Sequence, residues 1–150
     1  MSIRLATKKD AQTIHDLHTE SVTGLCNLYS NEIIEGWLKG RTPDGYKGID
    51  KNEMYVYEIA GRIVGFSHVV PGEIIAIFVS PDHAREGVGT KLLKHAIPLA
   101  KRGWDGPVKI KATLNAVPFY ESLGFRKIAD SVSPRNGIEI PIALMNSVEE

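Results

Sequence analysis

The residues best suited to chemistry lie where an apolar run gives way to glycines and then to a helical pattern. Residues 74–79 are apolar and partly β-branched, and Pro81 soon follows, which predicts a buried strand and then a turn. Gly87 and Gly89 come next, and apolar residues then recur at three- and four-residue spacing, which predicts a helix to about Arg102. Unpaired N–H groups at the beginning of such a helix, together with the positive end of its dipole, can bind a phosphate group.

Two common nucleotide-binding patterns do not fit this loop. A P-loop requires a glycine where Asp82 stands, and its lysine directly follows the second glycine, whereas Lys91 lies two residues after Gly89. A dinucleotide-binding fingerprint requires a third glycine where Leu92 stands. A nucleotide-binding loop is therefore disfavoured by its spacing. A glycine-containing connection without any ligand remains the alternative for the loop taken alone.

A second group of residues, from Thr113 to Phe125, combines a helix cap, an aromatic hydroxyl and a glycine stop. Asn115 can cap a short helix, Pro118 is tolerated in its first turn, and Gly124 is a natural left-handed stop. Tyr120 on that helix has an ordinary pKa of about 10, so its hydroxyl keeps at neutral pH a proton that it can donate. A packed aromatic ring with a satisfied hydroxyl is the alternative for Tyr120.

Both segments resemble motifs of the GNAT superfamily of N-acetyltransferases. The run Ala84-Arg85-Glu86-Gly87-Val88-Gly89 is similar to the acyl-CoA loop of that family, usually written Q/R-x-x-G-x-G/A. About 25 residues further on, the run N-A-V-P-F-Y-E-S-L-G-F resembles the C-terminal signature N-A-x-x-F-Y-E-x-L-G-F. Ala84 departs from the Gln or Arg of the pattern, so the resemblance implies weaker or differently organised CoA binding rather than none.

The resemblance implies one α/β (α+β) domain over residues 1–150. Six or seven strands would form a central, twisted, mixed but mostly antiparallel sheet, about four helices would flank it, and the central strand would splay away from the next. The resemblance also implies an acyltransferase that moves an acetyl group from acetyl-CoA, its co-substrate, to a primary amine by direct attack in a ternary complex, without a metal. The amine would belong to an unidentified small molecule, protein or peptide. A non-catalytic acyl-CoA-binding sensor or subunit on the same fold is the alternative.

The resemblance also assigns roles to individual residues. The loop would cradle the pyrophosphate of CoA, chiefly through backbone N–H groups, and the residues in this role are Arg85, Glu86, Gly87, Val88, Gly89 and Thr90. The backbones of Phe78 and Val79 would pair with the pantetheine arm, with the Val79 N–H facing the thioester oxygen. Asn115 would contact CoA, and Tyr120 would protonate the departing thiolate.

The general base is less sharply defined by the sequence. Glu73 stands just before the predicted central strand, where some family members carry a catalytic glutamate, and a solvated carboxylate at a strand end is the alternative. His68 on the neighbouring predicted strand is a rival, because the ordinary pKa of a histidine suits the task. The first two helices and the final hairpin loop would build the acceptor pocket, with three candidates: Tyr29, Trp37 and Arg135.

The rest of the pattern predicts the elements that hold these residues. Apolar spacing from Ala11 to Val22 predicts a first helix, and Ser30 can cap a second helix through Leu38. Pro98 predicts a kink or an early end of the long helix. The further predicted strands are 3–5, 54–60, 63–70, 108–112, 128–130 and 138–145, with a hairpin around Gly61-Arg62 and loops at 39–52 and 131–137.

Composition limits the remaining choices. The chain is 43% hydrophobic and 24% charged, which is ordinary for a globular protein, and its formal net charge of 0 predicts no nucleic-acid partner. No apolar run approaches the roughly 18 residues of a membrane span and no signal-peptide core begins the chain, so we expect a cytoplasmic protein without a membrane partner. The one cysteine, Cys26, allows no internal disulfide. Family habit and the exposed edge of the final hairpin make a homodimer an expectation.

Overall fold

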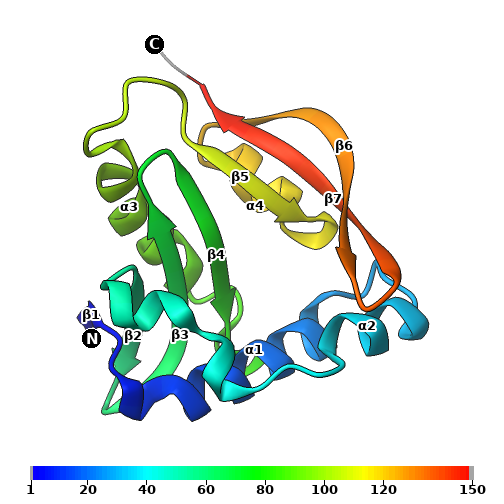
Figure 1. The fold of residues 1–150 in the computed structure, drawn as a ribbon. Helices are drawn as coiled ribbons and strands as arrows, with labels where there is room; N and C mark the ends of the chain where they lie inside the picture. Colours follow the sequence, from blue (N-terminus) through cyan, green and yellow to red (C-terminus); the bar gives the residue numbers. More distant parts are fainter. Residues whose placement is uncertain (1, 149–150) are drawn as a thin grey trace.

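The computed structural model describes residues 2–148, and seven strands at its centre form one sheet (Figure 1). The strands are β1 (Ser2–Leu5), β2 (Met54–Ile59), β3 (Arg62–Val70), β4 (Glu73–Val79), β5 (Lys109–Thr113), β6 (Phe125–Arg135) and β7 (Ile138–Ser147). Their order across the sheet is β1-β2-β3-β4-β5-β7-β6. Only β4 and β5 run parallel, and all other neighbours are antiparallel. The predicted mixed, mostly antiparallel sheet is confirmed.

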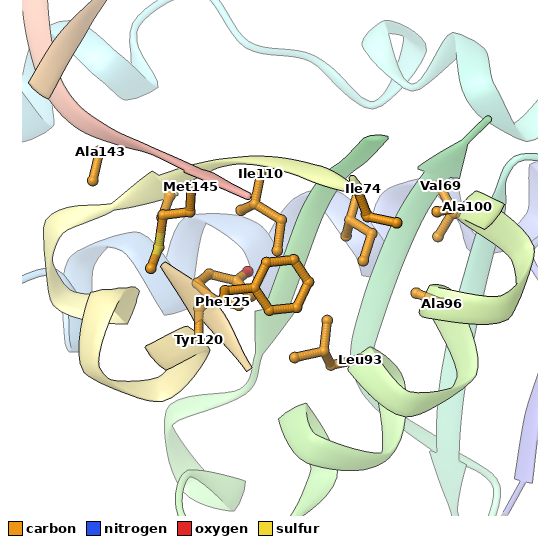
Figure 2. Close-up of a cluster of buried hydrophobic side chains, with 12 residues drawn as sticks. Val69, Ile74, Leu93, Ala96, Ala100, Ile110, Tyr120, Phe125, Ala143 and Met145 are labelled. Carbon is orange, nitrogen blue, oxygen red and sulfur yellow. The ribbon is translucent and has the colours of Figure 1, made fainter. Parts of the chain in front are cut away.

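Helices cover both faces of this sheet. They are α1 (Ala11–Leu25), α2 (Asn31–Leu38), α3 (Val88–Lys101) and α4 (Val117–Ser122). Leu93 and Ala96 of α3 pack against Ile74 and Ile110 in a core that also holds Tyr120 of α4 (Figure 2). No helix within residues 2–148 is long and apolar enough to span a membrane.

The opposite face of the sheet is covered by α1 and α2. Ile14 of α1 packs in one cluster with Phe66 of β3, and Val22 of α1 packs in another with Trp37 of α2 and Ile140 of β7. The side chains of β4 divide between the two layers, with Ile74 on the α3 side and Phe78 on the α1 side. The apolar pattern of β4 follows from this position, because both faces of a central strand meet other layers of the protein.

The hairpin between β2 and β3 confirms the prediction with a shift of one residue. Ile59 pairs with Arg62, so the turn consists of Ala60 and Gly61 rather than of Gly61-Arg62. Both turn residues have positive φ, 51° and 78°, as a two-residue type I′ turn requires. Alanine is uncommon at a turn position with positive φ. The sequence therefore predicted a turn that begins at Gly61, one residue later than the observed turn.

Residues 39–52 are not the irregular loop that the sequence predicts. They contain two short 3₁₀ helices, Pro43–Gly45 and Lys47–Lys51. Ile49 is buried and packs in the same cluster as Ile14 and Met54, and Tyr46 packs against that cluster. Tyr46 and Ile49 therefore anchor the segment. The sequence did not reveal these helices, because a 3₁₀ turn is too short to give a periodic apolar pattern.

Of the predicted kink or early end of α3 at Pro98, the early end is wrong, since the helix continues to Lys101. Pro98 is exposed, so the hydrogen bond that it cannot donate is lost on the solvent side of the helix. Ala96 and Ala100, on either side of it, are fully buried. The Ala100 carbonyl also accepts a 2.7 Å hydrogen bond from the N–H of Gly72. Tertiary contacts on the buried face therefore hold the last turn.

The last two strands are longer than predicted, and the expected loop at 131–137 is mostly part of β6. Asn136 and Gly137 alone form the turn, both with positive φ, 50° and 77°. An Asn-Gly pair is the strongest local signal for a type I′ hairpin, and here it outweighs the polar residues before it. β6 forms an edge of the sheet, where Ile128 and Val132 are exposed, and the homodimer stays a prediction.

Candidate active site

The parallel strands β4 and β5 separate soon after they begin. They pair only at Glu73 with Lys109 and at Ile74 with Ile110, while both strands continue beyond these pairs. Figure 1 shows the gap widening between the two ribbons toward the end of β4. The predicted splay is confirmed, and the β5-facing backbone groups of residues 75–79 have no ladder partner there.

A β-bulge accompanies the splay. On β4, Ala76 pairs with His68 and Ile74 pairs with Val69, which leaves Ile75 as the extra residue opposite β3. A bulge bends its strand and changes the direction of its side chains. Ile75 and Ala76 consequently line the same cleft, although residues adjacent in a regular strand face opposite sides.

Two clefts open at the splay. The first, which we call the loop cleft, has a volume of about 470 Å³ and lies between the end of α1, the loop after β4, the beginning of α3, and α4. The second, the hairpin cleft, has a volume of about 580 Å³ and is walled by α1, α2, the segment 40–46, β4 and the β6–β7 hairpin. Phe78 and Thr113 line both clefts. The two clefts therefore adjoin at these two residues.

The loop after β4 has a backbone suited to an anion. Gly87 caps α3 with a φ of 85°, and space is open where its Cβ would stand. Arg85 also has a positive φ, 65°, which is a strained conformation for a residue with a side chain. The N–H of Lys91 bonds to the Gly87 carbonyl, whereas the N–H groups of the preceding first turn have no intrahelical partner. The loop thus presents backbone donors toward its cleft.

Most of the residues predicted to contact the cofactor line the loop cleft. They are Phe78, Val79, Arg85, Gly87, Gly89, Thr90 and Asn115. The side chains of two other predicted residues are engaged elsewhere. The Glu86 carboxylate lies 3.2 Å from Nδ1 of His83, and Val88 is buried in a cluster with Val64 and Leu92. The Val88 side chain is thus turned into the core, whereas the Glu86 side chain stays exposed beside His83.

The sequence predicts that Asn115 caps α4, but the structure shows otherwise. It lies inside a 3₁₀ turn, Leu114–Ala116, and the N-cap position of α4 is Ala116. The Asn115 amide donates to Oδ1 of Asn27 at 2.6 Å, and its Oδ1 accepts from the N–H of Leu28 at 3.2 Å. The side chain therefore fastens the α1–α2 connection to the end of β5, a contact between segments that no local pattern reveals.

Tyr120 lies at the inner wall of the loop cleft. Its ring is buried, with its centroid 5.1 Å from that of Phe119 and 6.0 Å from that of Phe125. Burial raises the pKa of Tyr120, because a phenolate would lose its hydration. The hydroxyl is therefore protonated at every physiological pH.

The two predicted candidates for the base both line the hairpin cleft. Glu73 stands at the first paired position of β4, beside the splay. His68 lies on the neighbouring strand, and its Nε2 is 3.0 Å from Oε1 of Glu53. Glu53 is a partner of His68 that the sequence did not single out. Among residues 2–148, no cluster of three or more His, Cys, Asp or Glu side chains could hold a metal ion.

The three predicted acceptor-pocket residues separate into two groups. Trp37 and Arg135 line the hairpin cleft. Tyr29 is instead buried behind its wall, where the hydroxyl donates to the Pro141 carbonyl at 2.6 Å and accepts from the N–H of Leu114 at 2.9 Å. Tyr29 therefore joins β7 to the turn after β5 and sets the spacing of the walls.

Arg41 is the residue of the hairpin cleft that sequence reasoning missed. It belongs to the segment 39–52, whose lack of periodicity gives no reason to select one cation. In the structure its guanidinium is half-buried, and it contacts His18 of α1 and Tyr46. Only the folding of this segment over α1 brings Arg41 into the cleft.

Comparisons with known proteins agree with this geometry. Residues 27–141 match the family described as "Acetyltransferase (GNAT) domain". The chain is similar to the L-amino acid N-acyltransferase MnaT of Escherichia coli (strain K12), with 30% identity over 112 residues that cover 67% of this chain and 63% of the relative. The chain spans 61–63% of the length of the curated relatives it matches.

Solved structures share the fold at lower identity. A GCN5-related N-acetyltransferase from Rhodopseudomonas palustris superimposes with a TM-score of 0.84 at 22% identity, over 97% of this chain and 94% of that one. The PaiA N-acetyltransferase from Thermoplasma acidophilum, solved in complex with coenzyme A, has a TM-score of 0.73 at 17% identity and covers 98% of each chain.

Proposed function

The chain belongs to the GNAT acetyltransferase family, and from this premise we propose that it transfers an acetyl group from acetyl-CoA to a primary amine by direct attack in a ternary complex. The observation that carries the proposal is the meeting of the two clefts at Phe78 and Thr113. A thioester in the loop cleft and an amine in the hairpin cleft can react there without a covalent enzyme intermediate. The whole chain, residues 1–150, would act as one acetyltransferase domain.

Acetyl-CoA fits the loop cleft as co-substrate. The free N–H groups of the first turn of α3 and the open space at Gly87 suit its pyrophosphate. The backbone of β4 beyond Ile74 lacks a β5 partner, so the pantetheine arm can pair with it as an added strand. In this arrangement the N–H of Val79 would stabilise the oxyanion that forms on the thioester carbonyl. Ala84 supplies no polar side chain, so the backbone would provide most of the pyrophosphate contacts.

Tyr120 is the proposed general acid. As the amine nitrogen bonds to the acetyl carbon, the carbon–sulfur bond breaks and the departing thiolate must receive a proton. Tyr120 lines the loop cleft, where its protonated hydroxyl would donate to the thiolate. Burial raises the pKa of Tyr120, which makes its hydroxyl a weaker acid than that of an exposed tyrosine.

Glu73 is the proposed general base. The attacking amine must be neutral, so a group on the hairpin-cleft side of the splay has to accept its proton, directly or through water. Glu73 lines that cleft, as does His68. Because Glu53 faces Nε2 of His68, the imidazole could accept a proton only at Nδ1, and His68 remains the rival base.

Thermal unfolding with acetyl-CoA tests the co-substrate. A ligand at a hundred times its dissociation constant stabilises a protein by about 2.7 kcal/mol, which is a shift of roughly 5–10 °C for a chain of this size. We expect this shift with acetyl-CoA and none with ATP or NAD. Absence of any shift with acetyl-CoA would contradict the proposed function.

Release of free CoA thiol in the presence of amines tests the transfer itself. We expect amine-dependent release from at least one class of primary amine. Binding of acetyl-CoA without release for any amine would instead indicate an acyl-CoA-binding sensor on this fold.

A further inference from the structure

The hairpin cleft contains a cation without a matching anion. Arg41 directs Nη2 toward Nδ1 of His18, at 2.5 Å, and toward the hydroxyl of Tyr46. Its Nη1 is buried and has no hydrogen-bond partner among the described residues. No carboxylate in residues 2–148 forms an ion pair with Arg41.

The two partners of Arg41 are neutral. Burial, followed by the charge of Arg41, lowers the pKa of His18 to about 3, so the imidazole carries no charge at neutral pH. Nδ1 then accepts from the guanidinium, and the remaining ring proton lies on Nε2. Burial also raises the pKa of Tyr46, which keeps its hydroxyl uncharged. The positive charge of Arg41 is therefore solvated by two neutral side chains and is not neutralised.

Other positively charged side chains lie near Arg41 at the hairpin cleft. Arg135 lines the hairpin cleft and is close enough to Arg41 to lower the pKa of its guanidinium, after the larger effect of burial. The adjoining depression of the surface is lined by Lys39, Arg41 and Arg135 and by no acidic side chain. Glu73, the acidic residue that lines the hairpin cleft, lies on β4 at the beginning of the splay.

A half-buried guanidinium without a carboxylate is costly, and an incoming anion recovers that energy. We propose that the hairpin cleft binds an amino acid as acetyl acceptor, with Arg41, assisted by Arg135, holding its carboxylate while its amine faces the splay. This inference rests on the proposed function. It names the acceptor class and the residue that selects it.

Arg41 lies near the splay, which supports an acceptor whose amine and carboxylate are close together. The ring of His18 contacts that of Phe78 in a tilted arrangement, with centroids 4.1 Å apart, and Arg41 contacts the same imidazole. Because Phe78 lines both clefts, a single side chain separates the guanidinium from the place where amine and thioester would meet. A free amino acid carries its amine and carboxylate on one carbon, whereas a peptide amine terminus has no such carboxylate.

Matched pairs of amines provide the test. The common L-amino acids and their primary carboxamides share the amine and the side chain but differ in the carboxylate. We expect the wild-type protein to acetylate at least one amino acid with a kcat/KM about 10- to 100-fold above that of its carboxamide, the range expected for a charge-assisted hydrogen bond. Equal rates for amino acid and carboxamide would overturn the proposal.

Substitution of Arg41 separates recognition from folding. Arg41→Gln should raise KM for the amino acid by about the same 10- to 100-fold factor and bring the ratio of kcat/KM between amino acid and carboxamide close to one, and Arg135→Gln should act in the same direction but less strongly. Arg62→Gln, an exposed arginine at the β2–β3 turn, is the matched control and should change neither rate. A preference for the carboxylate that survives in both cleft variants would also overturn the proposal.

Direct binding keeps the two proposals distinguishable. Thermal shifts with each amino acid and each carboxamide are measured with and without saturating CoA. A shift with amino acids that Arg41→Gln abolishes supports the carboxylate site even where no transfer occurs, and the absence of any amino-acid shift contradicts it. A missing acetyl-CoA shift contradicts the proposed function instead.

Discussion

Ile74 of β4 and Ile110 of β5 are the last residues that pair between the two parallel strands, and both clefts open beyond them. Both side chains belong to the core under α3, so the point of separation is fixed by packing on one face. The bulge at Ile75 begins at the next residue of β4 and directs side chains into the hairpin cleft. The packed core under α3 thus ends where the two clefts begin.

Replacing Tyr120 with phenylalanine tests the general acid. Tyr120→Phe removes only the hydroxyl, so we expect kcat to fall by about 10²-fold while the acetyl-CoA thermal shift is retained. Tyr57→Phe is the matched control, because Tyr57 is buried in the cluster beside α3 and does not line either cleft. An unchanged kcat in Tyr120→Phe would remove this residue as the acid.

The loop assignment is tested at Gly87. Gly87→Glu places a carboxylate in the open space that the pyrophosphate would occupy, and we expect the acetyl-CoA shift to disappear. A side chain at a φ of 85° also strains the backbone by about 1 kcal/mol. Gly103→Glu shares this strain, with a φ of 72° and open space, but lies away from both clefts, so it should keep the shift. Retained binding of acetyl-CoA in Gly87→Glu would contradict the assignment of this loop as the pyrophosphate site.

The general base is tested by its effect on the pH profile. Glu73→Gln should lower kcat/KM by about 10²- to 10⁴-fold and remove the acidic limb of the pH–rate curve. Glu139→Gln, an exposed carboxylate on β7, should leave both unchanged. If His68→Gln produces these effects and Glu73→Gln does not, the base is His68.

Asp10 predicts a specific dependence of stability on pH. Its carboxylate accepts from Nη1 and Nη2 of Arg4, at 2.8 and 3.0 Å, and from the N–H of Thr7, at 2.8 Å. The hydrogen bond from Arg4 is the largest cause of its lowered pKa. A lowered pKa in the folded state means that the stabilisation is complete above the unfolded value of about 3.9 and is lost as pH falls through the folded value.

We therefore expect Asp10→Asn to reduce the free energy of unfolding by about 1–2 kcal/mol at neutral pH. The difference from wild type should narrow as pH falls below about 4, which urea unfolding at several pH values would show. Asp50→Asn is the control, since its pair with Lys8 at 3.7 Å is exposed and should contribute less than about 0.5 kcal/mol. A constant difference at all pH values would contradict the role of the ionised carboxylate.

Pro98 predicts a stabilising substitution. Pro98→Ala restores the hydrogen bond to the Lys94 carbonyl, and because Pro98 is exposed no core contact is lost. Alanine also gives the unfolded chain more conformational freedom, which offsets part of this gain. We therefore expect a net increase of about 1–2 kcal/mol in the free energy of unfolding, measured with urea. Pro43→Ala, at the start of a 3₁₀ helix where proline is well tolerated, should give no gain. A loss of stability in Pro98→Ala would show that the ring has a packing role.

The sequence by itself determined the family, the order of the principal elements and the loop with its glycines. These features are local, because a glycine cap, an apolar run and the Asn115–Phe125 signature lie within a few residues of one another. The same locality explains two errors. The polar composition of residues 131–137 concealed an Asn-Gly hairpin turn, and the effect of Pro98 was judged without the core contacts of Ala96 and Ala100.

Only the tertiary structure decided how the clefts are formed. The bulge at Ile75 depends on the register between β3 and β4, and the role of Asn115 depends on a contact with Asn27, 88 residues away. Arg41 enters the hairpin cleft because Ile49 anchors its segment against α1. Such contacts join residues distant in sequence, and the free energy of burying Ile49 has no trace in the local pattern around Arg41. The chemistry of the loop is therefore visible in the sequence, whereas the chemistry that would select the acceptor follows from the fold.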